Sequence, residues 1–244
     1  MAFTLEQVIP WGRSFADYRQ MFALSDGDLR QRILGCADGP ASFNAEASKL
    51  GARVTSVYPL YSYSTADIRA RIKEVCPEVL EQTRRNRDGF VWREYPSLEA
   101  VGRARLRAMV RFLKDFPVGH DSGRYVTAEL PELPFESRSF DLALCSHLLF
   151  LYSEQLGDEF HLDSVAELCR VAEEVRIFPL ITLGNYPSPH VHLVMRAAER
   201  VGRRVRIEQV PYEFQRGGNQ MLRITMHPHP SPLPEGEGVT GNSE

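Results

Sequence analysis

Apolar residues along the chain gather in short strand-like runs that are separated by longer stripes with helical spacing. Short apolar runs end at Leu34 and at Val57, and the segment between them, residues 41–51, predicts a helix that stops at Gly51. A glycine-rich turn, Gly35–Gly39, connects the first run to this helix. Strand, turn, helix and strand in this order form a βαβ unit, and such crossovers imply a parallel sheet.

The same alternation resumes after residue 122. The pattern predicts a third strand at Tyr125–Glu129, a fourth at Phe140–Ser146, a helix at 159–174, a strand at 174–181 and a helix at 189–202. Two alternating runs between residues 204 and 226 then flank Arg216–Asn219, which is typical of an antiparallel hairpin. These elements together predict a doubly wound α/β fold.

The segment 62–122 interrupts this alternation with two predicted helices, at 66–85 and 97–116. A plain crossover needs one helix, so we interpret 62–122 as a helical insertion that caps the carboxyl edge of the sheet. We expect one domain over residues 1–226. The tail, residues 227–244, is rich in proline, glycine and polar residues and is expected to be disordered. An apolar stripe on the second helix is the face expected to be buried: Leu98, Val101, Met109, Phe112, Leu113 and Phe116.

Composition narrows the class of protein. Of the 244 residues, 43% are hydrophobic, and the net charge is -3, so no overall basic field favours nucleic acid or an anionic membrane. No apolar run is long enough to span a membrane, and the N-terminal residues do not resemble a signal peptide. The four cysteines form no C-x-x-C pair, which favours reduced thiols in a cytoplasmic protein and predicts no metal site.

The predicted insertion is locally basic. The range from Arg69 to Lys114 contains twelve lysines and arginines but only six acids. Within it, Arg103, Arg107 and Arg111 recur at intervals of four residues. A solvated helix face explains this pattern. An anionic substrate that docks under the insertion is the alternative, whereas nucleic acid lacks the interleaved aromatic residues that would support it.

Two segments point to a family. The turn in ILGCADGPASF, residues 33–43, lets a backbone approach a ligand at the positive end of the next helix. Leu133-Pro134-Phe135 followed by Phe140-Asp141 resembles the "LPF…FD" stretch of class I (Rossmann-like) S-adenosylmethionine-dependent methyltransferases. The similarity covers roughly residues 30–226. It implies a mostly parallel seven-stranded sheet with an antiparallel last strand.

The resemblance also implies a cofactor, S-adenosylmethionine, and its contacts. In this family the first turn holds the methionine moiety, residues after the third strand flank adenine, and residues after the fourth strand lie beside the methyl group. Carried over to this sequence, the cofactor-binding residues are Gly35, Cys36, Ala37, Asp38, Gly39, Tyr58, Glu129, Leu130 and Ser146.

Two positions depart from the family pattern. Ala37 replaces the middle glycine and is expected to need a negative φ, and Tyr58 stands where an acid normally holds the ribose hydroxyls. Exchanging a carboxylate for a tyrosine there loses on the order of 1–2 kcal/mol of hydrogen bonding. An alternative to an enzyme is therefore a non-catalytic, methyltransferase-like binding or scaffold protein. A nicotinamide-dependent oxidoreductase is disfavoured because the turn lacks G-x-G-x-x-G.

The sequence is less specific about the residues that bind the methyl acceptor than about those that bind the cofactor. Open α/β sheets bind ligands at their carboxyl edge, and a small-molecule acceptor is the expected partner. His147 is either a satisfied core residue or a substrate contact and general base, which makes it the candidate catalytic residue. The predicted substrate-binding residues are Trp11, Arg13, Tyr61, Tyr63, His147 and Tyr186.

Overall fold

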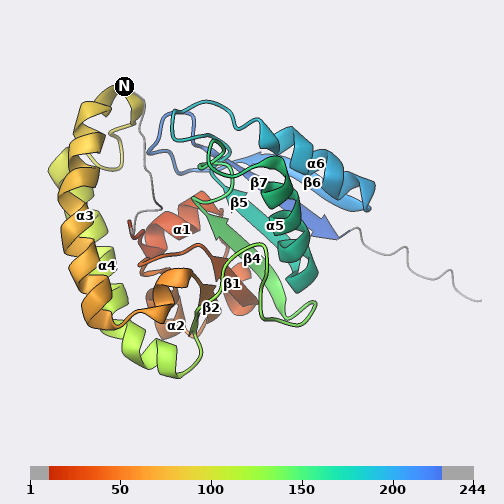
Figure 1. Ribbon diagram of the computed structural model, residues 1–244, viewed down its shortest axis with the longest axis horizontal. Coiled ribbons are helices and arrows are strands. Elements are labelled where there is room, and N and C mark those ends of the chain that lie inside the picture. The colour runs from red at the N-terminus through yellow and green to blue at the C-terminus, as the bar shows by residue number, and fades with distance from the viewer. Residues whose placement is uncertain (1–10, 227–244) are drawn as a thin grey trace, which may run out of the picture.

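The computed structural model describes residues 11–226. These residues form one sheet with helices on both faces (Figure 1). The α-helices are α1 Phe15–Met21, α2 Phe43–Lys49, α3 Thr65–Arg85, α4 Leu98–Asp121, α5 Asp158–Val171 and α6 His190–Arg200. The strands are β1 Arg32–Cys36, β2 Arg53–Val57, β3 Tyr125–Val126, β4 Phe140–Ser146, β5 Ala172–Phe178, β6 Arg203–Gln209 and β7 Gln220–Met226.

The sheet has seven strands in the order β3-β2-β1-β4-β5-β7-β6. Strands β1 to β5 pair in parallel, and β7 runs antiparallel to both β5 and β6. The doubly wound, mostly parallel sheet with a reversed last strand is thus confirmed. The strand order reverses at β1 and β4, because β2 and β3 continue to one side of this pair and β5 to the other. Ligand sites of open α/β sheets lie at the carboxyl ends of strands at such a point.

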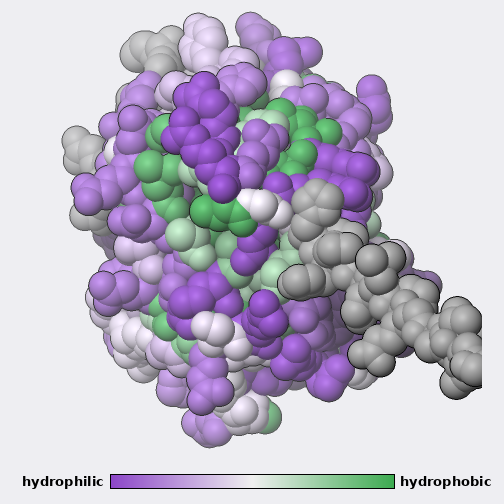
Figure 2. All heavy atoms as spheres, turned by 90° about the vertical axis from the view of Figure 1, so that its right-hand side faces the viewer, coloured by the Kyte–Doolittle hydropathy of each residue, from purple (hydrophilic) through white to green (hydrophobic). Residues whose placement is uncertain are grey.

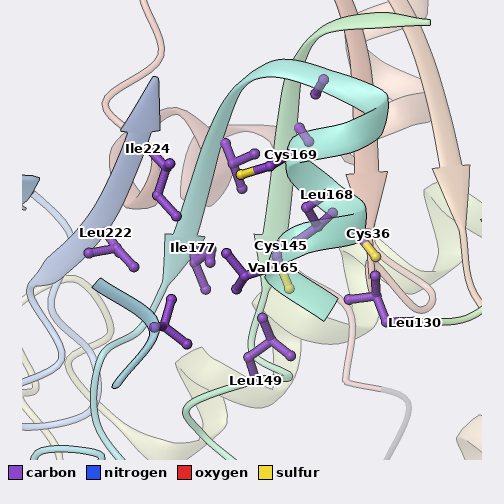
Figure 3. Packing of buried hydrophobic residues seen from close by; sticks show 14 of the residues in the cluster. Cys36, Leu130, Cys145, Leu149, Val165, Leu168, Cys169, Ile177, Leu222 and Ile224 are labelled. Carbon is purple, nitrogen blue, oxygen red and sulfur yellow. The ribbon is translucent and has the colours of Figure 1, made fainter. Parts of the chain in front are cut away.

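Alternate residues of the central strands pack on opposite faces of the sheet. Leu34 and Cys145 face α5 and α6, in the apolar cluster that Figure 3 shows between α5 and the strands. Ile33 and Leu144 face the other side, where they meet apolar residues of α1, α2 and α4. Because both faces are covered, the strands read as continuous apolar runs, which is typical of a buried parallel sheet.

The helical insertion contains the antiparallel pair α3 and α4, which lies along one side of the sheet in Figure 1. Helix α4 packs against α2 and β3 and therefore acts as the crossover between β2 and β3. A third apolar cluster joins α3, α4 and β3 and includes Ile68, Ile72 and Phe112. Of the predicted apolar stripe on α4, all but Leu98 are buried.

Several boundaries differ from the sequence prediction. Strand β3 ends at Val126, so Glu129 lies outside it, where a single antiparallel bridge joins it to Glu132. Helix α5 ends at Val171 and β5 starts at once, so the predicted helix to residue 174 was too long. The predicted disordered tail, 227–244, lies outside the described residues. Between residues 11 and 226, no helix is long and apolar enough to cross a membrane.

The side of the molecule that lies on the right in Figure 1 faces the viewer in Figure 2, where hydrophilic residues cover most of it and hydrophobic residues gather near its middle. Strand β6 is the edge strand of the sheet. Its sequence RRVRIEQ carries three arginines, and every one of its residues is exposed or only partly buried. Charged side chains on an edge strand oppose pairing with the strands of other molecules. Strand β6 therefore ends the sheet with an edge that disfavours pairing with further strands.

Candidate functional site

The carboxylate of Asp38 holds the turn after β1 in place through two hydrogen bonds. Its Oδ1 accepts a hydrogen bond from the Tyr18 hydroxyl at 2.6 Å, and its Oδ2 accepts one from Ser56 Oγ at 2.6 Å. Burial raises the pKa of Asp38 to about 6, although both hydrogen bonds act in the opposite direction. The Tyr61 hydroxyl donates to the Gly39 carbonyl at 2.8 Å. Asp38 and Tyr61 thus tie the turn to α1, β2 and the segment after β2.

Gly35 is required by this arrangement of Asp38. A Cβ atom on Gly35 would lie 1.9 Å from Asp38 Oδ2, and Gly35 lines neither of the cavities described below. The expected negative φ at Ala37 is wrong, because this residue has a φ of 59° and is left-handed. Side chains are disfavoured there because Cβ crowds the following carbonyl. Ala37 therefore adopts a backbone conformation that glycine favours.

Replacing Ala37 with glycine is expected to stabilise the protein. Relief of the left-handed conformation contributes about 1–2 kcal/mol, which the greater freedom of glycine in the unfolded chain offsets by about 0.5–1 kcal/mol. We expect a net gain of about 0.5–1 kcal/mol in the free energy of unfolding, measured in urea. Ala70→Gly, at an exposed position of α3, is the matched control and should cost about 1 kcal/mol. A destabilised Ala37→Gly variant would contradict the left-handed conformation.

A large cavity of about 730 Å³ opens at the carboxyl ends of β1, β2 and β3. Cys36 and Ala37 of the first turn line it on one side, and Glu129 and Leu130 line it on the other. The turn after β1 and the acid after β3 thus share one cavity, as a nucleoside-bearing ligand would require. Other lining residues are Val57, Tyr58, Pro59, Leu60, Tyr63, Asp67, Ile68, Arg71, Ala128, Leu148, Leu156 and Phe160.

A small cavity of about 120 Å³ lies on the other side of Ala37 and Tyr58, which line both cavities. It is bounded by Asp38 and Gly39 of the turn and by Ser146 and His147 at the end of β4. Aromatic side chains form much of the remaining wall: Trp11, Tyr18, Phe90, Tyr152, Phe178, Tyr212 and Phe214. The two cavities adjoin at Ala37 and Tyr58, and the smaller one has largely aromatic walls.

His147 is held in a defined orientation at the small cavity. Its backbone is left-handed, with a φ of 53°, and its N–H donates to the Phe178 carbonyl at 2.7 Å. The Nδ1 atom lies 3.0 Å from Ser146 Oγ. Burial, followed by the charges of Arg13 and Arg105, lowers the pKa of His147 well below its usual value. The imidazole is therefore neutral at physiological pH, and one of its two ring nitrogens can accept a hydrogen bond.

The remaining predicted residues fall at different places. Trp11 and Arg13 line the small cavity, and Tyr63 lines the large one. Tyr61 is buried beneath the turn and lines neither cavity. Tyr186 is 73% exposed and also lines neither. Among residues 11–226, no group of three His, Cys, Asp or Glu side chains has an arrangement that could hold a metal.

The sequence did not lead us to predict that the segment between β6 and β7 forms part of the wall of the small cavity. Phe214 stacks on Phe90 with ring centroids 4.8 Å apart, and the Val91 N–H donates to the Phe214 carbonyl at 2.7 Å. The segment after α3 thus closes the small cavity against the hairpin link. The signal available in the sequence was the aromatic pair in PYEF, residues 211–214, although no local pattern says which cavity such a pair reaches.

Comparison with known proteins gives one relative with strong sequence similarity. No protein-family model matches the sequence. The chain is 31% identical over 222 residues to the Uncharacterized protein MJ0045 of Methanocaldococcus jannaschii, a match that spans 90% of this chain and 97% of that protein. The chain belongs to the family of this protein. The relative is itself uncharacterized, so membership of this family assigns no activity.

The strand order of this chain, with β7 antiparallel to β5 and β6, agrees with the sheet that the sequence resemblance implies. Solved structures with a similar chain path have low sequence identity. Magnesium protoporphyrin IX methyltransferase (ChlM) from Synechocystis PCC 6803 with bound SAH is 12% identical, with a TM-score of 0.46, and the match covers 87% of this chain and 84% of that one. The methyltransferase domain of bacterial CtHen1-C is 13% identical, with a TM-score of 0.45, over 82% and 92% of the two chains.

Proposed function

We propose that the protein is an S-adenosylmethionine-dependent methyltransferase whose acceptor is a small molecule. The observation that carries this proposal is the large cavity shared by the first turn and Glu129. Its volume of about 730 Å³ lies in the range of small-molecule sites, about 300–1,000 Å³. The strand order and the reversed β7 support the same family resemblance.

The residues present fit the nucleoside part of such a cofactor. Leu60, Leu130 and Leu148 offer apolar contacts to an adenine ring, and the Glu129 carboxylate can accept hydrogen bonds from its exocyclic amine. Ala37 and Tyr58 would lie where the cofactor passes from the large cavity to the small one. The methionine part would then reach the small cavity beside Ser146.

When bound, S-adenosylmethionine supplies an electrophilic methyl group. The chain contributes alignment, which accounts for about 7–11 kcal/mol of barrier reduction when reacting groups are held in position. His147 contributes a neutral imidazole at the wall of the small cavity, which can accept a hydrogen bond from an acceptor hydroxyl or amine. The hydrogen bond to Ser146 and the backbone bond to Phe178 keep this ring in place.

Calorimetry with S-adenosylmethionine and S-adenosylhomocysteine tests the proposal. We expect saturable binding of both by the unmodified protein. Absence of heat at millimolar ligand would instead favour a non-catalytic binding protein of the same fold. The specific observation behind that second candidate is Tyr58, which stands at the end of β2 with no carboxylate beside it in the sequence VTSVYPLY.

Replacing Tyr58 with aspartate is expected to tighten S-adenosylhomocysteine binding by about 5- to 30-fold, because a carboxylate accepts two ribose hydroxyl bonds where tyrosine offers one. Tyr58 lines both cavities, so the new carboxylate would face the site. Tyr63→Asp adds the same charge at an exposed position of the large cavity and should change the affinity by less than about twofold. Equal effects of the two substitutions would argue that residue 58 does not contact ribose.

A further inference from the structure

Two adjacent rows of exposed side chains run along α4. Residues four apart in a helix lie one above the other, so each row follows one face of the helix. The first row is basic and consists of Arg103, Arg107 and Arg111. The second row is mostly apolar and consists of Leu106, Val110, Lys114 and Val118. We call the two rows together the α4 strip. Its three apolar side chains are between 49% and 70% exposed, so the fold does not bury them.

The positive charge of the α4 strip is largely unpaired. Three of its cations form no ion pair with the residues that the structure describes: Arg103, Arg107 and Lys114. The fourth, Arg111, lies 3.6 Å from Glu46 of α2. Asp115 continues the basic row, but its carboxylate is bound to Arg124 at 2.9 Å. The chain as a whole has a net charge of -3, so the strip is a local excess of positive charge on an acidic protein.

The α4 strip lies on the solvent side of its helix. The opposite side of α4, with Phe112 and Phe116, packs into the apolar cluster that it forms with α3 and β3. Figure 1 shows α3 and α4 along the side of the molecule that lies farthest from α6. From Arg103 to Val118 the strip is about 22 Å long, at a rise of about 1.5 Å per residue. The strip is therefore an open, extended surface and not a pocket.

The combination of the two rows limits the partner that fits the strip. A membrane with anionic lipids offers negative head groups to the basic row and acyl chains to the apolar row, and long basic side chains can reach the head groups while their stems lie on apolar surface. Clusters of four or more basic residues on an amphipathic helix are typical of proteins that bind anionic lipids. Nucleic acid offers phosphates but leaves the apolar row exposed to water. A second copy of the chain would bring like charges together.

We propose that the α4 strip docks the protein on membranes that contain anionic lipids. The guanidinium groups of the basic row contact the head groups, and Leu106 and Val110 enter the boundary between head groups and acyl chains. Because the rest of the protein is acidic, binding depends on the strip and weakens as salt screens its charges. The proposal is independent of methyl transfer, because no residue of the strip lines either cavity.

Co-sedimentation of the full chain with vesicles of phosphatidylglycerol and of phosphatidylcholine tests this surface, because the two lipids differ in net charge. We expect at least 10-fold tighter binding to phosphatidylglycerol. Arg107→Gln should weaken that binding about 5-fold, the contribution of one basic residue near an anionic surface. Arg196→Gln, an exposed arginine of α6, is the matched control and should change it by less than twofold. The comparison of the two lipids on the unmodified protein does not depend on how any variant folds.

Leu106→Gln tests the apolar row and should weaken binding to phosphatidylglycerol at least 3-fold. Val201→Gln, at an exposed position that ends α6, is its control and should have no effect. Equal binding to the two lipids, binding to neither, or binding that Arg107→Gln leaves unchanged would overturn the proposal.

Two other outcomes would assign the strip to a different partner, and the proposal would then fail. In the first, a single-stranded DNA of 20 nucleotides binds more tightly than the vesicles, Arg107→Gln weakens its binding, and Leu106→Gln does not. That result would identify a nucleic-acid surface. In the second, the protein forms a dimer in analytical ultracentrifugation that Leu106→Gln dissociates, and it does not bind vesicles. That result would show that the strip contacts a second copy of the chain.

Discussion

Arg105→Ala is expected to lower the free energy of unfolding by about 3–5 kcal/mol, the range found when one partner of a buried ion pair is removed. Arg105 is 1% exposed, and its Nη1 lies 2.8 Å from Asp17 Oδ2. Its Nη2 donates to the Tyr212 hydroxyl at 2.8 Å, so one guanidinium joins α4 to α1 and to the hairpin link. The substitution leaves the Asp17 carboxylate buried without a cation.

Urea denaturation of Arg105→Ala measures this effect, and Arg103→Ala, two residues away on the exposed face of α4, is its control. The control should stay within about 0.5 kcal/mol of the unmodified protein. Removing both charges, as Asp17→Asn with Arg105→Ala, should cost less than the sum of the single changes, because no buried charge is then left unpaired. A loss below about 1 kcal/mol for Arg105→Ala alone would show that Asp17 finds water or another partner.

Gly35→Ala is expected to cost about 3–5 kcal/mol, through overpacking of about 1–3 kcal/mol and the loss of hydrogen bonds to a buried carboxylate. The added methyl would overlap the Asp38 carboxyl group, whose Oδ2 lies 1.9 Å from the Cβ position. Asp38 would have to leave Tyr18 and Ser56, which anchor the turn. We also expect at least a 10-fold loss of S-adenosylhomocysteine affinity, because this turn lines both cavities.

A double variant tests whether the clash with Asp38 causes the loss of stability in Gly35→Ala. With Asp38→Ala already in place, the methyl at residue 35 has room, so Gly35→Ala should then cost less than about 1 kcal/mol by urea denaturation. Gly157→Ala is the control for replacing a glycine as such, since nothing lies within 4 Å of its Cβ position, and it should cost about 1 kcal/mol or less. If Gly35→Ala costs the same with and without Asp38, the steric explanation is wrong.

The sequence pattern predicted the elements of the sheet best where they are long and apolar. The bounds of β4 agree with the prediction to the residue, because the strand is buried on both faces and carries the continuous apolar run Leu142–Cys145. Strand β3 was predicted too long, since only Tyr125 and Val126 pair with β2. Residues 127–129 resemble strand residues locally, but no neighbouring strand extends far enough to pair with them.

The charge pattern of the insertion described its exposed face correctly, because Arg103, Arg107 and Arg111 are exposed. It missed Arg105, which is one of the twelve basic residues of the insertion and is among the largest fully buried side chains of the described chain. Its partner Asp17 lies 88 positions earlier. Since helical spacing reports only on neighbours three or four residues apart, a buried ion pair between distant helices leaves no local signal.

By itself the sequence determined the doubly wound fold, the turn after β1 and the acid after β3, because strand periodicity, glycine and the order of elements are local properties of the chain. Tertiary structure alone decided that the site has two cavities divided at Ala37 and Tyr58, and that Phe90 and Phe214 close the smaller one. It also decided that Ala37 is left-handed. These features arise from contacts between segments far apart in the chain, whose free energy is set by packing and not by any single stretch of residues.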